Sequence, residues 1–138
     1  MAHAASKCWT VVAIATAEEP LKIRCDDAAF DQGSLGTLGK ASPVEYLLIS
    51  VASCFALSLR MAMTERHLAP KSFTVGVVAA KAPTPPSRLH ALELEVQLPE
   101  ALNDERYSLI RRAKELCTVT NTLTQPPQLR VVAHDPAA

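Results

Sequence analysis

Residues 42–67 read SPVEYLLISVASCFALSLRMAMTERH and contain the most apolar segment of the chain. The segment opens with a strong helix-start pattern: Ser42 as N-cap, Pro43 at the first helical position and Glu45 three residues after the cap. It is close to membrane-spanning length, but it holds Glu45, Arg60 and several serines. We therefore predict a buried central helix. Because this helix is apolar on every side, it needs protein all round it, which a dimer supplies better than one small domain.

The bulk composition predicts one small domain, residues 1–138, with 49% hydrophobic residues to build a core. Fourteen basic and fourteen acidic side chains cancel, and no basic run stands out, so neither nucleic acid nor a membrane is the expected partner. The first residues lack a secretory pattern, which favours the cytoplasm. In that reducing compartment, cysteines are more often catalytic, redox-active or metal-binding than structural.

Short strands are predicted on both sides of the central helix. Residues 9–17 and 21–26 are rich in β-branched residues and form a hairpin around the turn Glu18-Glu19-Pro20. Residues 31–40 hold three of the four glycines and predict a loop that leads into the central helix. That helix should end at about His67, before Pro70.

The second half of the chain predicts another hairpin and a second helix. Residues 89–98 alternate apolar and polar side chains, which is typical of a strand with one buried face. In chain order we expect a strand over 72–81, a proline-rich turn over 82–87, a strand over 89–98, a helix over 104–117 capped by Asn103, a short turn over 118–123 and a final strand over 129–133. The order β-β-α-β-β-α-β indicates an α+β fold and argues against a dinucleotide-binding fold.

Two cysteines carry the chemical hypothesis. Cys54 lies inside the central helix between small residues, which leave room for a substrate or another chain element to approach the sulfur. Taken alone, it is more simply a small core hydrophobe. Cys117 lies at the end of the second helix and precedes polar residues that are atypical of a core position. A second thiol is what a redox cysteine needs, because it can condense with the sulfenic acid that forms when a thiolate attacks a peroxide.

Two spaced motifs resemble the OsmC/Ohr family of osmotically inducible and organic hydroperoxide resistance proteins. Residues 42–56 (SPVEYLLISVASCFA) resemble its NPEELLLAALAGCFA block, and residues 113–121 (AKELCTVTN) resemble its second cysteine block. The spacing from Pro43 to Cys54 also matches, and the resemblance extends from about residue 42 to 133. It implies an OsmC-like fold in an intertwined, swapped homodimer with the long helices at its centre.

The resemblance also implies a chemistry. By position, Cys54 would be the peroxidatic and Cys117 the resolving cysteine of a thiol peroxidase that reduces organic hydroperoxides. The family's reductant is typically a dithiol such as a lipoyl group on a protein, and neither a metal nor an organic cofactor is expected.

The surroundings of Cys54 depart from the family pattern. Family peroxidases place a Glu directly after the helix-starting Pro and pair it with an Arg from the N-terminal hairpin turn, whereas this chain has Val44 and an acidic turn. Glu45 is explained as the capping partner of Ser42, with a supporting catalytic role as the lesser alternative. Arg24 is a candidate for the missing cation, although a solvent-facing strand residue is the simpler interpretation. Arg60, about 600° round the helix from Cys54, is interpreted as an interface or snorkelling residue.

The other cysteines and the histidines give weaker hypotheses. Cys8 and Cys25 lie on the two strands of the first hairpin and can face each other, with His3 as a further metal ligand, but the spacing fits no zinc pattern. Incidental cysteines are the preferred interpretation. The remaining histidines, which we interpret as surface residues, have no Cys or Asp partner at the spacing of a catalytic motif: His67, His90 and His134.

Three functions remain open from the sequence. The first is the thiol peroxidase. The second is a non-catalytic dimer that binds a hydrophobic small molecule near Cys54, favoured by the missing Arg/Glu pair. The third is a purely structural interaction protein, which rests only on the lack of other motifs.

Overall fold

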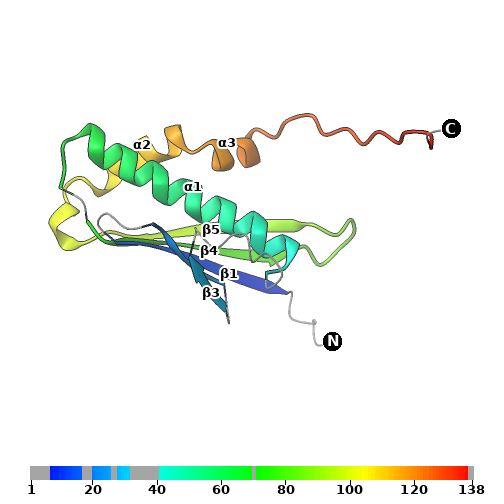
Figure 1. Cartoon of the computed structure of the whole chain (residues 1–138), viewed down its shortest axis with the longest axis horizontal. Coiled ribbons are helices and arrows are strands. Elements are labelled where there is room, and N and C mark those ends of the chain that lie inside the picture. The colour runs from blue at the N-terminus through cyan, green and yellow to red at the C-terminus, as the bar shows by residue number, and fades with distance from the viewer. Residues whose placement is uncertain (1–6, 17–19, 26–27, 32–40, 70, 137–138) are drawn as a thin grey trace.

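A single antiparallel sheet with helices on one side makes up the chain (Figure 1). The computed structural model describes residues 7–16, 20–25, 28–31, 41–69 and 71–136. Its elements in chain order are β1 (Cys8–Ala15), β2 (Lys22–Cys25), β3 (Ala28–Asp31), α1 (Pro43–Glu65), β4 (Phe73–Lys81), β5 (Leu89–Gln97), a 3-10 helix (Glu100–Leu102), α2 (Arg106–Leu116) and α3 (Thr118–Thr124). The predicted α+β class is confirmed.

The sheet has the strand order β3-β2-β1-β4-β5, with β1 at its centre. Every second residue of β1 is buried, beginning with Trp9, so one face of the strand packs under α1. The predicted pairing of the first two strands is confirmed by the antiparallel register of β1 with β2, in which Ala13 lies opposite Ile23. The hairpin of β4 and β5 is confirmed in the same way, with Val77 opposite Leu94.

Helix α1 begins where its sequence predicts, through a complete capping box. The Ser42 side-chain oxygen accepts a hydrogen bond from the Glu45 backbone N–H at 3.2 Å, and the Ser42 N–H donates to Glu45 Oε1 at 3.0 Å. The helix ends at Glu65, two residues earlier than predicted, because His67 turns the chain with a φ of 56°. By length and composition α1 is long and apolar enough to cross a membrane, and 56% of its most apolar window is buried in the protein.

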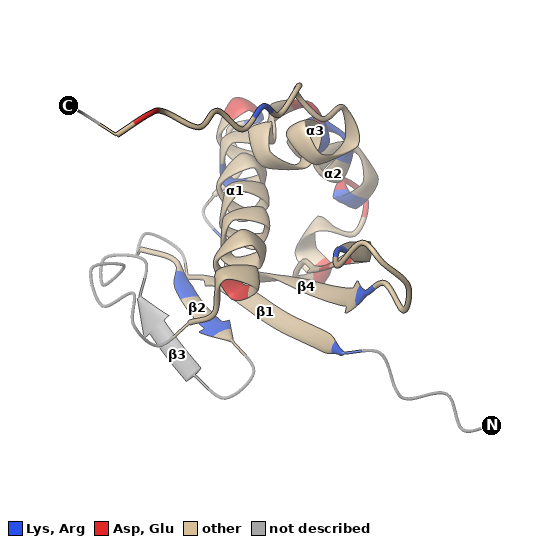
Figure 2. Cartoon of the chain, turned by 90° about the vertical axis from the view of Figure 1, so that its right-hand side faces the viewer, with Lys and Arg blue, Asp and Glu red and all other residues tan. Residues whose placement is uncertain are grey.

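The two helices that follow the sheet pack against α1 on the side away from β2 (Figures 1 and 2). A bidentate salt bridge joins α1 to α2, since Arg112 Nε and Nη2 donate to the two carboxylate oxygens of Glu65 at 2.9 Å. Leu109 and Ala113 of α2 are fully buried. The end of α2 is thereby fixed over the middle of α1, which positions Cys117.

Strand β3 was not predicted: the sequence indicated a strand over 21–26 and a loop over 31–40, and no element between them. Ala28–Asp31 instead pairs with β2 in antiparallel register, with Phe30 opposite Ile23. The segment is only four residues long, so its own pattern is too short to indicate a strand, and pairing with β2 decides its conformation. The rest of the predicted loop and of the first turn lies outside the described residues.

The predicted start of the second helix was wrong. Asn103 has αR geometry (φ −55°, ψ −43°) at the end of the 3-10 helix, whereas an N-cap residue takes an extended conformation. The 3-10 turn buries Leu102, and α2 therefore begins only at Arg106, after Glu105. The short turn predicted over 118–123 is the helix α3, Thr118–Thr124.

The predicted final strand over 129–133 is also wrong within this protomer. The C-terminal segment, residues 125–136, is irregular and exposed, and it projects away from the body of the protein (Figure 1). Leu129 and Val131 are 83% and 88% exposed. A strand exists only where a neighbour completes its ladder, and the described residues of this protomer place none beside the segment.

Candidate functional site

The two predicted cysteines come together in the fold. Cys54 lies in the middle of α1, and Cys117 is the single residue between α2 and α3. The Cys54 thiol is within hydrogen-bond reach of the Cys117 side chain, although the two residues are 63 positions apart in the sequence. Both are free thiols. Cys117 is completely buried, whereas Cys54 is only partly buried.

The break between α2 and α3 explains how this contact forms. Cys117 has an extended backbone (φ −79°, ψ 98°), so the chain changes direction at the thiol and a new helix starts with Thr118. The first N–H groups of a helix have no partner inside it. Here the N–H groups of Thr118 and Val119 are directed to Cys54 as hydrogen-bond donors. The start of α3 thus supplies polar contacts to a sulfur on α1.

Opposing effects act on the pKa of Cys54, and the net result is a raised pKa. Burial is the largest effect and raises the pKa, because it disfavours the thiolate. The Val119 N–H lowers the pKa, the Cys117 thiol raises it, and the Thr118 N–H lowers it slightly. Among the described residues, no lysine or arginine contributes to this shift. At neutral pH the Cys54 side chain of this protomer is therefore mainly a thiol.

The residues considered as support for Cys54 lie elsewhere in this protomer. Glu45 Oε1 accepts a hydrogen bond from the Ser42 N–H in the capping box. Arg24 is exposed on β2, and its neighbours Ile23 and Cys25 are buried toward the core, so Arg24 lies on the sheet face opposite α1. Arg60 Nη2 donates to the Thr16 carbonyl at 2.8 Å and so ties α1 to the end of β1.

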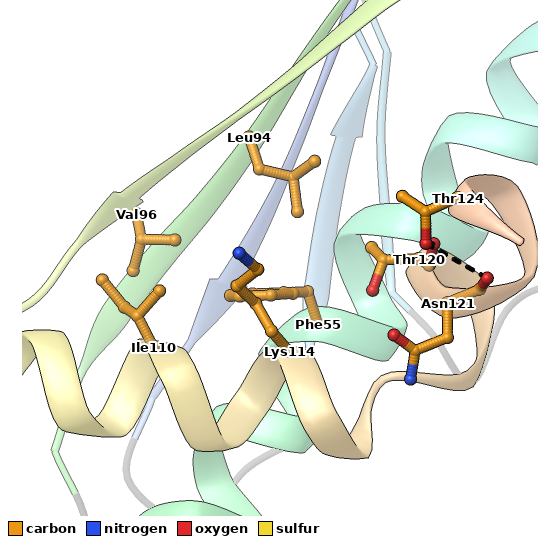
Figure 3. Close-up of a pocket in the computed structure, with 8 residues that line it drawn as sticks. All are labelled: Phe55, Leu94, Val96, Ile110, Lys114, Thr120, Asn121 and Thr124. Atoms are coloured by element: carbon orange, nitrogen blue, oxygen red, sulfur yellow. Dashed lines mark hydrogen bonds between the residues drawn. The ribbon is translucent and has the colours of Figure 1, made fainter.

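An open apolar groove of about 390 Å³ is formed by α1, β5, α2 and α3, and its described lining includes Phe55, which follows Cys54 in the chain, but neither cysteine (Figure 3). Its lining comes from the helix residue next to Cys54, from the inner face of β5, and from α2 and α3: Phe55, Leu94, Val96, Ile110, Lys114, Thr120, Asn121 and Thr124. None of these residues was predicted from the sequence as a site residue. The alternation in β5 was the available signal, since its apolar positions are only half-buried in the protomer.

The other cysteines do not face each other, which corrects the pairing considered from the sequence. In the sheet, Cys8 lies opposite Ala80 of β4, whereas Cys25 lies opposite Val11 of β1. Cys8 is exposed and Cys25 is buried in the core. Among the described residues, no group of three His, Cys, Asp or Glu side chains could hold a metal, and His3 lies outside them. The exposed histidines are, as expected, His67, His90 and His134.

Comparisons with known proteins give a family and a fold. Residues 32–132 match the family model described as OsmC-like protein. An OsmC-like hydroperoxide resistance protein from Jannaschia sp. CCS1 superposes with a TM-score of 0.58 and 18% identity, over 95% of this chain and 93% of that one. An organic hydroperoxide resistance protein from Legionella pneumophila gives a TM-score of 0.45 and 17% identity, over 89% and 91%. None of the curated protein sequences matches the chain.

Proposed function

This chain belongs to the OsmC-like protein family, and from that premise we propose that it is a thiol peroxidase that reduces organic hydroperoxides with Cys54 and Cys117. The hydroperoxide resistance fold supports a peroxide-related redox role. The observation that carries the cysteine mechanism is the contact between the two thiols beside the N–H groups of α3.

The proposed reaction consumes one hydroperoxide and oxidises one pair of thiols. The Cys54 thiolate attacks the outer oxygen of ROOH, the O–O bond breaks, and the departing alkoxide takes a proton to become the alcohol. Cys54 is left as a sulfenic acid. The Cys117 sulfur then attacks the Cys54 sulfur and expels the hydroxyl group as water, which forms a disulfide. A dithiol, for which a lipoyl group on a protein is our candidate, reduces this disulfide by exchange.

The contact between the two thiols favours fast disulfide formation, whereas the raised pKa of Cys54 favours slow attack on the hydroperoxide. Because Cys117 already contacts Cys54, the second step requires no large movement of the backbone. The first step is limited by the small thiolate fraction that the raised pKa of Cys54 allows. Four free cysteines suit a reducing compartment, and we place the protein in the cytoplasm, where a dithiol reductant is available.

The apolar groove favours an organic hydroperoxide over hydrogen peroxide. Phe55 lines the groove and directly follows Cys54 in the sequence. Thr120 also lines the groove and belongs to α3, which begins directly after Cys117. An apolar group of the substrate could occupy the groove while its hydroperoxide approaches Cys54. This arrangement uses burial of apolar surface for specificity.

We further propose a homodimer in which the C-terminal segment pairs with a second copy. Its apolar residues Leu129, Val131 and Val132 are exposed in the protomer, and β5 is an edge strand of the sheet. Exposed apolar strands and open sheet edges are normally covered in a stable protein. A second copy would bury both. It would also be placed to bring side chains to Cys54 that one protomer does not supply.

Thiol counting tests the peroxidase directly. Reduced protein mixed with an equimolar amount of cumene hydroperoxide should lose two thiols, and peptide mapping should find Cys54 joined to Cys117. The Cys54→Ser variant should lose none, whereas Cys8→Ser serves as a matched control and should behave as the wild type. If Cys54 and Cys117 both stay reduced at this peroxide concentration, the peroxidase function is excluded.

The groove also supports the second candidate, a dimer that binds a hydrophobic small molecule without chemistry. No described cation lowers the pKa of Cys54, and a groove of about 390 Å³ is large enough for such a ligand. In this case the Cys54→Ser variant should bind an apolar fluorescent probe as tightly as the wild type. Replacing Leu94 with Asp should abolish binding. Loss of binding in folded Cys54→Ser protein would contradict this candidate.

A further inference from the structure

A second cavity, of about 230 Å³, lies at the opposite end of the sheet from the start of α2. It is formed where β1 starts, β4 ends, β5 starts and α1 begins. We call it the basic pocket, and its lining residues are Lys7, Trp9, Val44, Lys81, Ser87, Arg88 and Leu89. Val44 is ten residues before Cys54, about 15 Å along α1, so the pocket is separate from the thiols of the same chain.

Three cations from adjacent segments meet in this pocket. The Lys81 N–H donates to the Lys7 carbonyl at 3.0 Å, which places the two lysines opposite each other, and Figure 2 shows basic residues at the adjoining ends of β1 and β4. Lys7 precedes Trp9 by two residues and Lys81 follows Ala79 by two, and Trp9 and Ala79 are an inward-facing pair, so the two lysines lie on the same face of the sheet. Like charges directly opposite each other on one face are destabilising. The position therefore favours an anion that offsets them.

No carboxylate among the described residues offsets the positive charges of the basic pocket. The salt bridges of the described residues involve only Arg112, which lies on α2. Glu45, the acidic residue in the first turn of α1, is engaged in the capping box. Val44 is the second residue of α1, so the positive end of the helix dipole adds to the field of the three cations.

The cations are arranged for contact with an anion. Arg88 Nη1 donates to the Thr84 and Pro86 carbonyls, each at 3.0 Å, which fixes the guanidinium on the turn between β4 and β5. Its remaining donors have no partner among the described residues. The Lys7 ammonium lies 4.9 Å from the centre of the Trp9 ring. A guanidinium held in this way loses little entropy when it binds an oxyanion.

We propose that the basic pocket binds an oxyanion, a carboxylate or a phosphate, carried by a small molecule. Its volume lies below the roughly 300 to 1,000 Å³ of pockets that enclose a drug-sized ligand. The occupant is therefore a compact anion or the anionic head of a larger ligand. Ser87 adds a hydroxyl, and the rim formed by Leu89 can contact an apolar body.

The chain provides its own reporter for this site, because Trp9 is its only tryptophan. We would titrate the full chain with inorganic phosphate and, separately, with benzoate, at constant ionic strength set with chloride. Trp9 emission and titration calorimetry would be followed together, so that binding without an optical change is still detected. A saturable signal is expected. Tighter binding of benzoate would indicate a carboxylate on an apolar body, and tighter binding of phosphate would indicate a phosphate group.

Matched variants decide whether the signal comes from the pocket. Lys81→Gln and Arg88→Gln should each raise the dissociation constant about tenfold or more, since each removes a charge-assisted hydrogen bond. Lys22→Gln, an exposed lysine on β2, should leave it unchanged. Far-ultraviolet circular dichroism would establish that every variant is folded. The proposal is overturned if neither anion saturates, or if Lys81→Gln and Arg88→Gln both bind as tightly as the wild type.

Discussion

Cys54 has opposing contacts that act on its proton. Burial and the adjacent Cys117 thiol favour the neutral thiol, while the N–H groups of Val119 and Thr118 favour the thiolate. Burial is the largest effect, so the pKa of Cys54 is raised. With this arrangement the Cys54 thiol is a weak nucleophile, because only deprotonation, which an added cation would favour, makes the sulfur a good one.

The raised pKa predicts a strong pH dependence of peroxide reduction. Well below this pKa, the thiolate fraction grows about tenfold per pH unit, and the rate of Cys54 oxidation by cumene hydroperoxide should rise with it. The rate should continue to rise above the pH at which an ordinary cysteine levels off. Single-turnover thiol loss between about pH 6 and 10 measures it. A flat profile across neutral pH would show that the thiolate is already formed, as a cation from a second copy would cause.

Removing the second thiol should separate the two chemical steps. In the Cys117→Ser variant, Cys54 should still react with hydroperoxide but stop as a sulfenic acid, because no sulfur is present to condense with it. A dimedone adduct on Cys54, identified by mass spectrometry, measures the trapped species. The wild type should give a disulfide and little adduct. Equal disulfide formation in the variant would mean that another cysteine resolves Cys54.

At the scale of elements, α1 positions the residues of the candidate site. Its start is fixed by the capping box, and its middle carries both Cys54 and Phe55. The salt bridge from Glu65 to Arg112 and the buried Leu109 hold α2 against it. The thiol contact depends on this packing, since Cys117 is placed by the end of α2.

The capping box predicts a measurable cost when its serine is removed. Ser42→Ala should lower the free energy of unfolding by about 1 kcal/mol, because the Glu45 N–H loses its acceptor at the start of α1. Ser42→Asp should restore most of it, since aspartate is also a good N-cap. Urea unfolding followed by circular dichroism gives both values. An unchanged midpoint in Ser42→Ala would mean that the cap contributes nothing.

At the scale of the whole molecule, one protomer leaves apolar surface open. The groove, the half-buried face of β5 and the C-terminal segment all carry apolar side chains that the protomer does not cover. Burying an exposed leucine or valine is worth about 1.5 to 3 kcal/mol, so several together provide a substantial driving force for association.

Loss of the C-terminal segment should therefore weaken the proposed dimer. Deleting residues 127–138 removes Leu129, Val131 and Val132, and the shortened protein should shift toward a monomer in light scattering coupled to size exclusion. The double change Leu129→Asp and Val131→Asp in the full chain should do the same without shortening it. A dimer of unchanged stability in both proteins would show that the segment lies outside the interface.

The sequence by itself determined the parts of this protein that rest on local signals. The capping residues placed the start of α1, alternation placed β5, and two spaced motifs indicated the family, in which Cys54 and Cys117 remain the proposed site. Tertiary structure decided the rest, because it depends on partners distant in the chain. Pairing with β2 makes β3 a strand, and burial of Leu102 delays α2. Residues 129–133 have no ladder because no strand of the described part of this protomer lies beside them. The contact between Cys54 and Cys117, and with it the raised pKa, arises only when α2 packs on α1 and breaks at the thiol.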